Sequence, residues 1–248
     1  MPFIFEFVCL SFCTRSFLFL SSSCSFFMLK ILCKLCFVIV IFGAFHISQN
    51  LIAVKPNPIG VHDEMIIHTM FIRDWLFKNP EVIRWLLIAS SLWIDIVFIY
   101  LVKKGIVGST MRPIFGLCFI FTLRQLMMAL VSLPIIESNL WRDPQFPSLC
   151  VTYGTTNDFF FSGHTSLAVY GAIELCRVDN GKYPKHRFFG WILAVFEIAF
   201  VSILHAHYTM DIFTGIFVAV SAANFACWLE KKVTIGFVQR VKADETKL

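Results

Sequence analysis

Two short polar segments interrupt this apolar chain, and both carry residues that could do chemistry. One contains Ser162, Gly163 and His164, and the other contains His207 and Asp211. Ionisable groups in membrane segments are energetically costly and are by default functional. His207 and Asp211 are four residues apart, so they share one helical face if a helix begins there. A carboxylate that holds one ring nitrogen of His207 would leave the other nitrogen as a nucleophile.

The segment around His164 has the features of a phosphate site. Ser162 offers a hydroxyl, and Gly163 permits close approach of the backbone at the start of a predicted helix. The N–H groups and the positive dipole at a helix N-terminus favour an anion, and His164 could protonate a leaving alkoxide. The pattern predicts displacement at a phosphate ester, although a Ser-Gly helix start is also ordinary capping and the histidines could serve only as hydrogen-bonding groups.

Two arginines in predicted helices have more than one role open to them. Arg124 lies mid-span, where a charge costs roughly 2.5 to 3.5 kcal/mol on insertion scales. It either points at phosphate or pairs with one of three acidic residues, Asp95, Glu174 and Glu197. Arg112, near the end of the same helix, is expected to be a flanking residue whose charge reaches the interface.

Three polar residues beside the histidine segments are candidates for the rim of the site. Asp158 and Tyr208 either contact a cationic group of the substrate, the tyrosine through its ring face, or anchor the chain at the membrane interface. His205 lies two residues before His207 and is expected at the pocket rim rather than as a second nucleophile.

The nine cysteines lie mostly in apolar stretches and predict neither a disulfide framework nor a metal site. The chemistry expected here requires no cofactor.

The composition excludes a soluble globular domain. Of the 248 residues, 58% are hydrophobic and 15% are charged. In soluble domains about half of the residues are hydrophobic and about a quarter are charged. Since a membrane-spanning helix takes about 20 residues, we expect an all-α polytopic integral membrane protein with six transmembrane helices. The net charge of +5 is spread in short clusters, so nucleic acid is not an expected partner.

The predicted membrane-spanning helices place both polar segments at helix ends. The apolar stretches that could cross are residues 26–53, 82–102, 114–133, 165–176 with its flanks, 188–204 and 212–229. Residues 56–80 are predicted to lie flat at the interface as an amphipathic helix. Residues 1–25 are a cleaved signal, a further apolar segment or an unstructured leader. Residues 26–230 then form the membrane domain, and residues 231–248 form a basic cytosolic tail.

The distribution of lysine and arginine sets the expected orientation. The polar segments after the second, fourth and sixth predicted helices carry most of the positive charge and are therefore cytosolic. The alternate loops, which include both histidine segments, face the lumen or the exterior. His164 and His207 are thus predicted to meet across one shallow pocket on that side.

The two histidine segments resemble the second and third signatures of the type-2 phosphatidic-acid phosphatase superfamily. Residues 158–165, Asp-Phe-Phe-Phe-Ser-Gly-His-Thr, are similar to the sphingomyelin synthase motif, and residues 205–211, His-Ala-His-Tyr-Thr-Met-Asp, are similar to its partner motif. Residues 121–124, with the Leu-Pro pair that follows them, look still more like the phosphatidylcholine:diacylglycerol cholinephosphotransferases. The resemblance covers roughly residues 82–230.

One departure from the superfamily pattern separates its branches. The phosphatases have a Ser-Arg pair six residues ahead of the third-motif histidine, where this chain has Phe200-Val201. The transferases named above also lack that pair. A lipid head-group transferase is therefore favoured over a plain lipid phosphatase.

The resemblance implies transfer of phosphocholine, or a similar head group, from phosphatidylcholine to diacylglycerol or ceramide. His207, oriented by Asp211, would carry the phosphoryl group, and His164 would act first as acid and then as base. The residues expected to bind the substrate are Ser162, Gly163, Arg124, Asp158 and Tyr208.

The expected partners are a donor phospholipid, an acceptor lipid alcohol and the membrane. A homo-oligomer is left open. By analogy the protein would lie in the endoplasmic reticulum or the Golgi, with the site on the luminal face. Two alternatives remain: a phosphatase or phospholipase C-like hydrolase with the same residues, and a lipid-binding or scrambling protein without catalysis.

Overall fold

A bundle of helices makes up the described part of the protein, a computed structural model that covers residues 23–52, 61, 63–153, 160–178 and 184–245. Its helices are α2 (Ser23–Ile52), α3 (Glu64–Phe77), α4 (Pro80–Val107), α5 (Arg112–Leu130), α6 (Gly163–Val178), α7 (Pro184–Ile203) and α8 (Thr209–Glu245). Five of these, α2, α4, α5, α7 and α8, are long and apolar enough to cross a membrane. The predicted all-α fold with membrane-spanning helices is confirmed, whereas the predicted number of six is not.

The helix that falls short is α6, which corresponds to the fourth predicted span. Its 16 residues reach about 24 Å at 1.5 Å per residue, less than the roughly 30 Å of a hydrocarbon core. α6 packs against α4, α5, α7 and α8, so it is surrounded by the longer helices. Its shortness leaves room at one end of the bundle, and the segment that enters α6 occupies that end.

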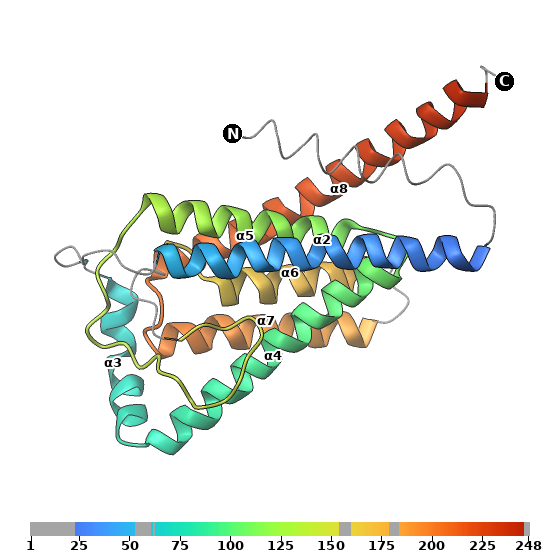
Figure 1. Ribbon diagram of the computed structural model, residues 1–248. Coiled ribbons are helices and arrows are strands. Elements are labelled where there is room, and N and C mark those ends of the chain that lie inside the picture. The colour runs from blue at the N-terminus through green and yellow to red at the C-terminus, as the bar shows by residue number, and fades with distance from the viewer. Residues whose placement is uncertain (1–22, 53–60, 62, 154–159, 179–183, 246–248) are drawn as a thin grey trace.

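The connections alternate between the two ends of the bundle (Figure 1). The short link between α4 and α5 lies at one end. The long loop between α5 and α6, the link between α7 and α8, and α3 all lie at the other end. α8 continues to Glu245, so residues 231–245 extend this helix beyond the bundle. The end that holds α3 therefore also receives both histidine segments.

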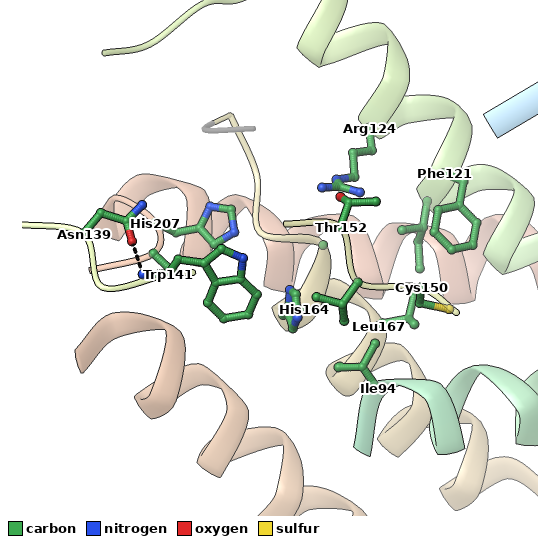
Figure 2. Close-up of a pocket in the computed structure, with 14 residues that line it drawn as sticks. Ile94, Phe121, Arg124, Asn139, Trp141, Cys150, Thr152, His164, Leu167 and His207 are labelled. Atoms are coloured by element: carbon green, nitrogen blue, oxygen red, sulfur yellow. Dashed lines mark hydrogen bonds between the residues drawn. The ribbon is translucent and has the colours of Figure 1, made fainter. Parts of the chain in front are cut away.

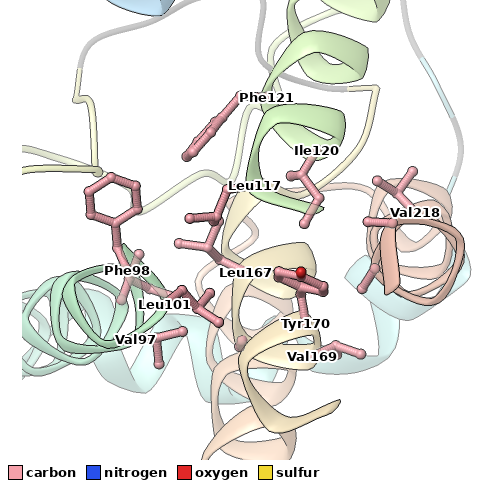
Figure 3. Close-up of a cluster of buried hydrophobic side chains, with 14 of the residues drawn as sticks. Val97, Phe98, Leu101, Leu117, Ile120, Phe121, Leu167, Val169, Tyr170 and Val218 are labelled. Atoms are coloured by element: carbon pink, nitrogen blue, oxygen red, sulfur yellow. The ribbon is translucent and has the colours of Figure 1, made fainter. Parts of the chain in front are cut away.

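The core of the bundle forms around α6 (Figure 3). Leu167, Val169 and Tyr170 of α6 are buried against side chains of α4, α5 and α8. At Gly116 of α5 the approach is so close that a Cβ would lie 2.0 Å from the Tyr170 hydroxyl oxygen. That hydroxyl donates to the carbonyl oxygen of Arg112 over 3.0 Å. Burial of apolar surface and one satisfied polar group thus fix α6 against α5.

A buried ion cluster closes the core at the end away from α3. Nε of Arg112 lies 3.1 Å from both carboxylate oxygens of Glu174, which is fully buried. Arg177 also contacts Glu174, and it donates to the carbonyl oxygen of Ala223 over 2.9 Å. The flanking role expected for Arg112 is therefore wrong, because its side chain turns inward to neutralise a carboxylate that burial would otherwise penalise.

The described residues that follow α5, 131–153, enter the bundle instead of covering it. Asp95, in the middle of α4, accepts hydrogen bonds from the backbone N–H groups of Leu149 and Cys150 and from the Ser148 hydroxyl. Irregular backbone at membrane depth is tolerated only where it is buried in protein or lines a cavity. Asp95 satisfies the donors of this loop and thereby holds it among the helices.

Helix α3 confirms the helix predicted within residues 56–80, and one carboxylate ties its start to the start of α8. Asp63 caps α3 through the N–H of Met65. It also accepts from the N–H and the hydroxyl of Thr209, at 2.7 and 2.8 Å. α3 packs on α4 and α7, and it leaves Phe71 and Trp75 exposed.

Candidate active site

The two histidine segments meet through their main chains. The backbone N–H of Ser162 donates to the carbonyl oxygen of Asp211 over 2.9 Å. One turn farther along α8, a Cβ on Gly215 would lie 2.9 Å from the carbonyl oxygen of Ser162 and 3.2 Å from Cβ of Thr165. Since only a hydrogen atom fits at Gly215, the first turns of α6 and α8 pack in direct contact.

His207 and Asp211 contact each other, but not from one helical face. α8 begins at Thr209, so His207 precedes the helix and Asp211 stands in its first turn. Oδ2 of Asp211 lies 3.5 Å from Nδ1 of His207 and accepts a hydrogen bond from the N–H of Tyr208 at 3.0 Å. An acidic residue that reaches back to the N-cap N–H is half of a capping box. This capping contact at the start of α8 brings the Asp211 carboxylate to the His207 ring.

His164 stands in the first turn of α6. The Ser162 hydroxyl accepts from the N–H of Thr165 over 3.2 Å, which is an N-cap bond. The His164 ring packs edge-on against Trp141, with 4.8 Å between ring centroids and 78° between planes. Nε2 of His164 is buried, and no residue in the described ranges forms a hydrogen bond with it. A buried ring nitrogen with proton-transfer capacity is thus held at the pocket.

Both histidines line one pocket together with Arg124 (Figure 2). His164 comes from the start of α6, His207 from the segment before α8, and Arg124 from α5. The Arg124 side chain lies over Gly163, because a Cβ there would be 3.2 Å from Nε and 3.3 Å from Cζ of the arginine. The prediction that the two rings share a pocket is confirmed.

The three carboxylates weighed as partners of Arg124 each have other partners among the described residues. Glu174 pairs with Arg112, as described above. Asp95 accepts from the loop that enters the bundle, and Glu197 accepts from the Ser90 hydroxyl. Arg124 itself lines the pocket.

The pocket changes character along its length. Asn139, His207 and Trp141 lie together at one side in Figure 2, and Arg124 and Thr152 lie between His207 and Phe121. On the other side of His164 from Asn139 are the apolar or weakly polar side chains Ile94, Phe121, Cys150 and Leu167. An amphipathic ligand with a phosphate at the polar side and a hydrocarbon portion at the other side fits this gradient.

Other sequence candidates do not reach the pocket. Tyr208 is buried, and its hydroxyl donates to the carbonyl oxygen of Pro134 over 3.1 Å. His205 is also buried, and its ring nitrogens hydrogen-bond with Thr69 at 2.9 Å and Ser138 at 2.6 Å. Neither lines the pocket, so the pocket-rim position expected for His205 is wrong. Asp158 lies outside the described residues.

Asn139 and Trp141 are among the pocket residues that sequence reasoning missed. Both lie in the loop between α5 and α6, where neither periodicity nor a motif marks them. The only available signal was a large aromatic residue in a polar loop between two predicted spans. Within the described residues, no three histidine, cysteine or acidic side chains gather as metal ligands.

Comparison with family models identifies a family to which the chain is similar. The family model described as AtPDCT1/2 matches residues 62–228, a region that includes α3 to α7, most of α8 and both histidine segments. Searches of curated proteins and of solved structures return no match.

Proposed function

The chain belongs to the AtPDCT1/2 family, a phosphatidylcholine:diacylglycerol cholinephosphotransferase family, and from this premise we propose that it moves phosphocholine from phosphatidylcholine to diacylglycerol through a phosphohistidine on His207. The observation that carries the proposal is that His164 and His207, far apart in the chain, line one pocket with Arg124. Two imidazoles and a guanidinium around one cavity are suited to transfer of a phosphoryl group.

The polarity of the pocket indicates how the donor lipid is oriented. The glycerol and acyl chains belong at the apolar side, near Ile94, Phe121 and Leu167, and the phosphate belongs among the polar groups. His164, which stands between His207 and the apolar side chains in Figure 2, is therefore assigned to the glycerol side of the phosphorus. His207 then approaches from the polar side, opposite the leaving oxygen, which is the geometry of an in-line displacement.

In the first step, Nε2 of His207 attacks phosphorus while the bond between phosphorus and the glycerol oxygen breaks. Asp211, beside Nδ1, orients the ring and stabilises the positive charge that develops on it. His164 gives its proton to the leaving oxygen, so diacylglycerol departs as a neutral alcohol. Arg124 and the N-terminus of α6 stabilise the charge on the phosphoryl oxygens.

The second step reverses the first with a new lipid alcohol. The hydroxyl of the acceptor diacylglycerol loses its proton to His164, and its oxygen attacks phosphorus as the bond to His207 breaks. The helices around the pocket limit the access of water, which would otherwise release free phosphocholine. On the charge pattern of the loops, we propose that this site faces the lumen of the endoplasmic reticulum or the Golgi.

The test uses purified protein in micelles with phosphatidylcholine and a diacylglycerol of different acyl composition. Phosphatidylcholine that carries the acyl chains of the added diacylglycerol, read by mass spectrometry, is the expected product. His207→Ala should lower the rate by at least about a hundredfold, since the covalent step is lost. His68→Ala is the matched control, because that histidine is exposed on α3, and it should keep the wild-type rate.

A donor with a better leaving group separates the two histidine roles. Nitrophenyl phosphocholine needs no proton on its leaving oxygen, so His164→Ala should still release nitrophenolate in the first step, and His207→Ala should not. Free phosphocholine without any transferred head group would favour the hydrolase. Product formation unchanged in His207→Ala would contradict the phosphohistidine, and a ceramide product formed faster than phosphatidylcholine would contradict the proposed acceptor.

A further inference from the structure

Trp141 is the aromatic residue nearest to the two candidate catalytic rings in the pocket. It lines the pocket with His164 and His207, and its ring centroid lies 4.8 Å from that of His164. Figure 2 shows it on the polar side, away from the apolar wall. In the donor placement proposed above, the head group that stays on the phosphorus is equatorial to the in-line axis, and we direct it toward Trp141.

The Trp141 side chain is held from both its backbone and its ring. The backbone N–H of Trp141 donates to Oδ1 of Asn139 over 2.6 Å, and the indole ring stacks on Tyr153 with 5.4 Å between ring centroids and 24° between planes. The Tyr153 hydroxyl in turn hydrogen-bonds with Ser91 of α4. An aromatic surface that is fixed before the ligand arrives loses little conformational entropy on binding.

The loop around Trp141 is also anchored at several points. The N–H of Leu140 donates to the carbonyl oxygen of Leu204 over 2.9 Å. Nε of Arg73 donates to the carbonyl oxygen of Ser138 over 3.0 Å, and the Ser138 hydroxyl bonds with the buried ring of His205. These contacts come from α3 and from the segment between α7 and α8, so they hold the loop that carries Trp141 in place.

The charges around the pocket favour an aromatic partner for a cationic head group. Of the described residues that line the pocket, none is a carboxylate, and one, Arg124, is a cation. A quaternary ammonium has no N–H to donate, and it is attracted to the face of a ring, with tryptophan the best partner. A primary ammonium is more strongly hydrated and needs acceptors for its three N–H groups.

On these grounds we propose that Trp141, supported by Tyr153, forms the subsite for the trimethylammonium group of the donor and thereby selects choline over ethanolamine. The inference rests on the proposed head-group transfer and adds the residue that recognises the head group. Tyr208, for which that contact was predicted, bonds to Pro134 instead.

The experiment compares donors within each variant. Transfer to diacylglycerol is measured from phosphatidylcholine, its mono- and dimethylated ethanolamine analogues and phosphatidylethanolamine. Trp141→Leu should lower kcat/KM for phosphatidylcholine by roughly three- to thirtyfold, the range that cation–π energies give, and should lower it progressively less as methyl groups are removed. Trp141→Phe should keep an intermediate selectivity. Trp85→Leu, at a tryptophan exposed on α4, should keep the wild-type ratios.

Several results would overturn the subsite. If Trp141→Leu lowers kcat/KM equally for all donors, the residue only supports the fold. If Trp141→Leu leaves kcat/KM for phosphatidylcholine unchanged, the ring does not contact the head group. If Trp141→Leu does not fold, the ratios of Trp141→Phe and Trp141→Tyr decide: donor ratios equal to those of wild type in both variants contradict the proposal.

A binding measurement separates this inference from the proposed function. Short-chain phosphatidylcholine, added to the protein in phosphatidylglycerol nanodiscs, should raise the melting temperature more than short-chain phosphatidylethanolamine does, and Trp141→Phe should reduce this difference. A wild-type protein that transfers no head group but shows the difference would overturn the transferase and support the subsite. Equal stabilisation by both lipids would overturn the subsite whatever the activity.

Discussion

The backbone N–H of Ser162 donates to the carbonyl oxygen of Asp211 over 2.9 Å, which joins the starts of α6 and α8 by main chain. The positions of His164 and His207 relative to one phosphorus therefore depend on backbone contact between these two helices and not on flexible side chains alone. This contact requires close approach, and the approach requires a glycine at position 215.

Gly215→Ala should weaken this contact. Its Cβ would lie 2.9 Å from the carbonyl oxygen of Ser162, so α8 must shift, at a cost of about 1–3 kcal/mol as for other overpacked sites. We expect a lower melting temperature and a transfer rate that falls even in the folded fraction. Gly43→Ala is the matched control, because a Cβ there meets no atom within 4 Å. Equal behaviour of the two variants would contradict the close-approach argument.

Asp211→Asn should separate orientation of the ring from folding. The amide oxygen can still accept from the N–H of Tyr208, so the start of α8 is preserved. The charge beside Nδ1 of His207 is lost, and with it the preference for the reactive tautomer. We expect transfer to fall by at least about a hundredfold with little change in melting temperature. Retention of more than a tenth of the wild-type rate would exclude the role given to Asp211.

Arg124→Gln and Arg112→Gln should fail in different ways. Loss of the Arg124 charge at the pocket is expected to lower kcat/KM by roughly ten- to a hundredfold, as for a charge-assisted hydrogen bond to phosphate. Loss of Arg112 removes a partner of the buried Glu174 and should destabilise the protein by about 3 kcal/mol or more. Both variants are compared by melting temperature and by transfer rate per folded protein. Arg124→Gln should lower mainly the rate, and Arg112→Gln should lower mainly the melting temperature.

Asp63 should make stability depend on pH in the acid range. Burial raises the pKa of this carboxyl, but hydrogen bonds from Thr209, Ile66 and Met65 outweigh it and leave the pKa below its ordinary value. A lowered pKa in the folded state gives stability that is present above about pH 4, the unfolded pKa, and is lost as the pH falls through the folded pKa. The melting temperature of Asp63→Asn should therefore depend less on pH between about 5 and 3 than that of wild type.

Glu64→Gln provides the control for this titration, because Glu64 is exposed beside Asp63. It should follow the wild-type pH profile. If the melting temperature of Asp63→Asn depends on pH as that of wild type does, the hydrogen bonds that Asp63 accepts from the starts of α3 and α8 do not cause the pH dependence of stability.

Much of the helical architecture could be predicted from the sequence, because each long apolar stretch must satisfy its backbone internally and bury its side chains. The ranges 82–102 and 114–133 fall on α4 and α5 with small shifts at their ends. The histidine segments were predictable for the same reason: polar side chains in so apolar a chain need a function. The length of α6 was the weak point, since hydropathy does not distinguish a short core helix from a span.

The arrangement of polar groups between distant segments was not predictable. From the sequence, Arg124 could pair with any of three carboxylates, and His205 and Tyr208 are closer in the chain to His207 than Asp211 is. No sequence pattern predicted that Asp95 would accept hydrogen bonds from a loop, and Trp141 lies in no recognisable motif.

The sequence by itself therefore determined the helices, the end of the bundle at which the two histidine segments lie, and the residue types available for phosphoryl transfer. Only the tertiary structure decided which of these side chains share a pocket, which become structural, and which aromatic ring stands beside the reacting groups. The physical reason is range: hydropathy and capping act within a few residues, whereas a buried hydrogen bond selects its partner from every segment that packing brings near.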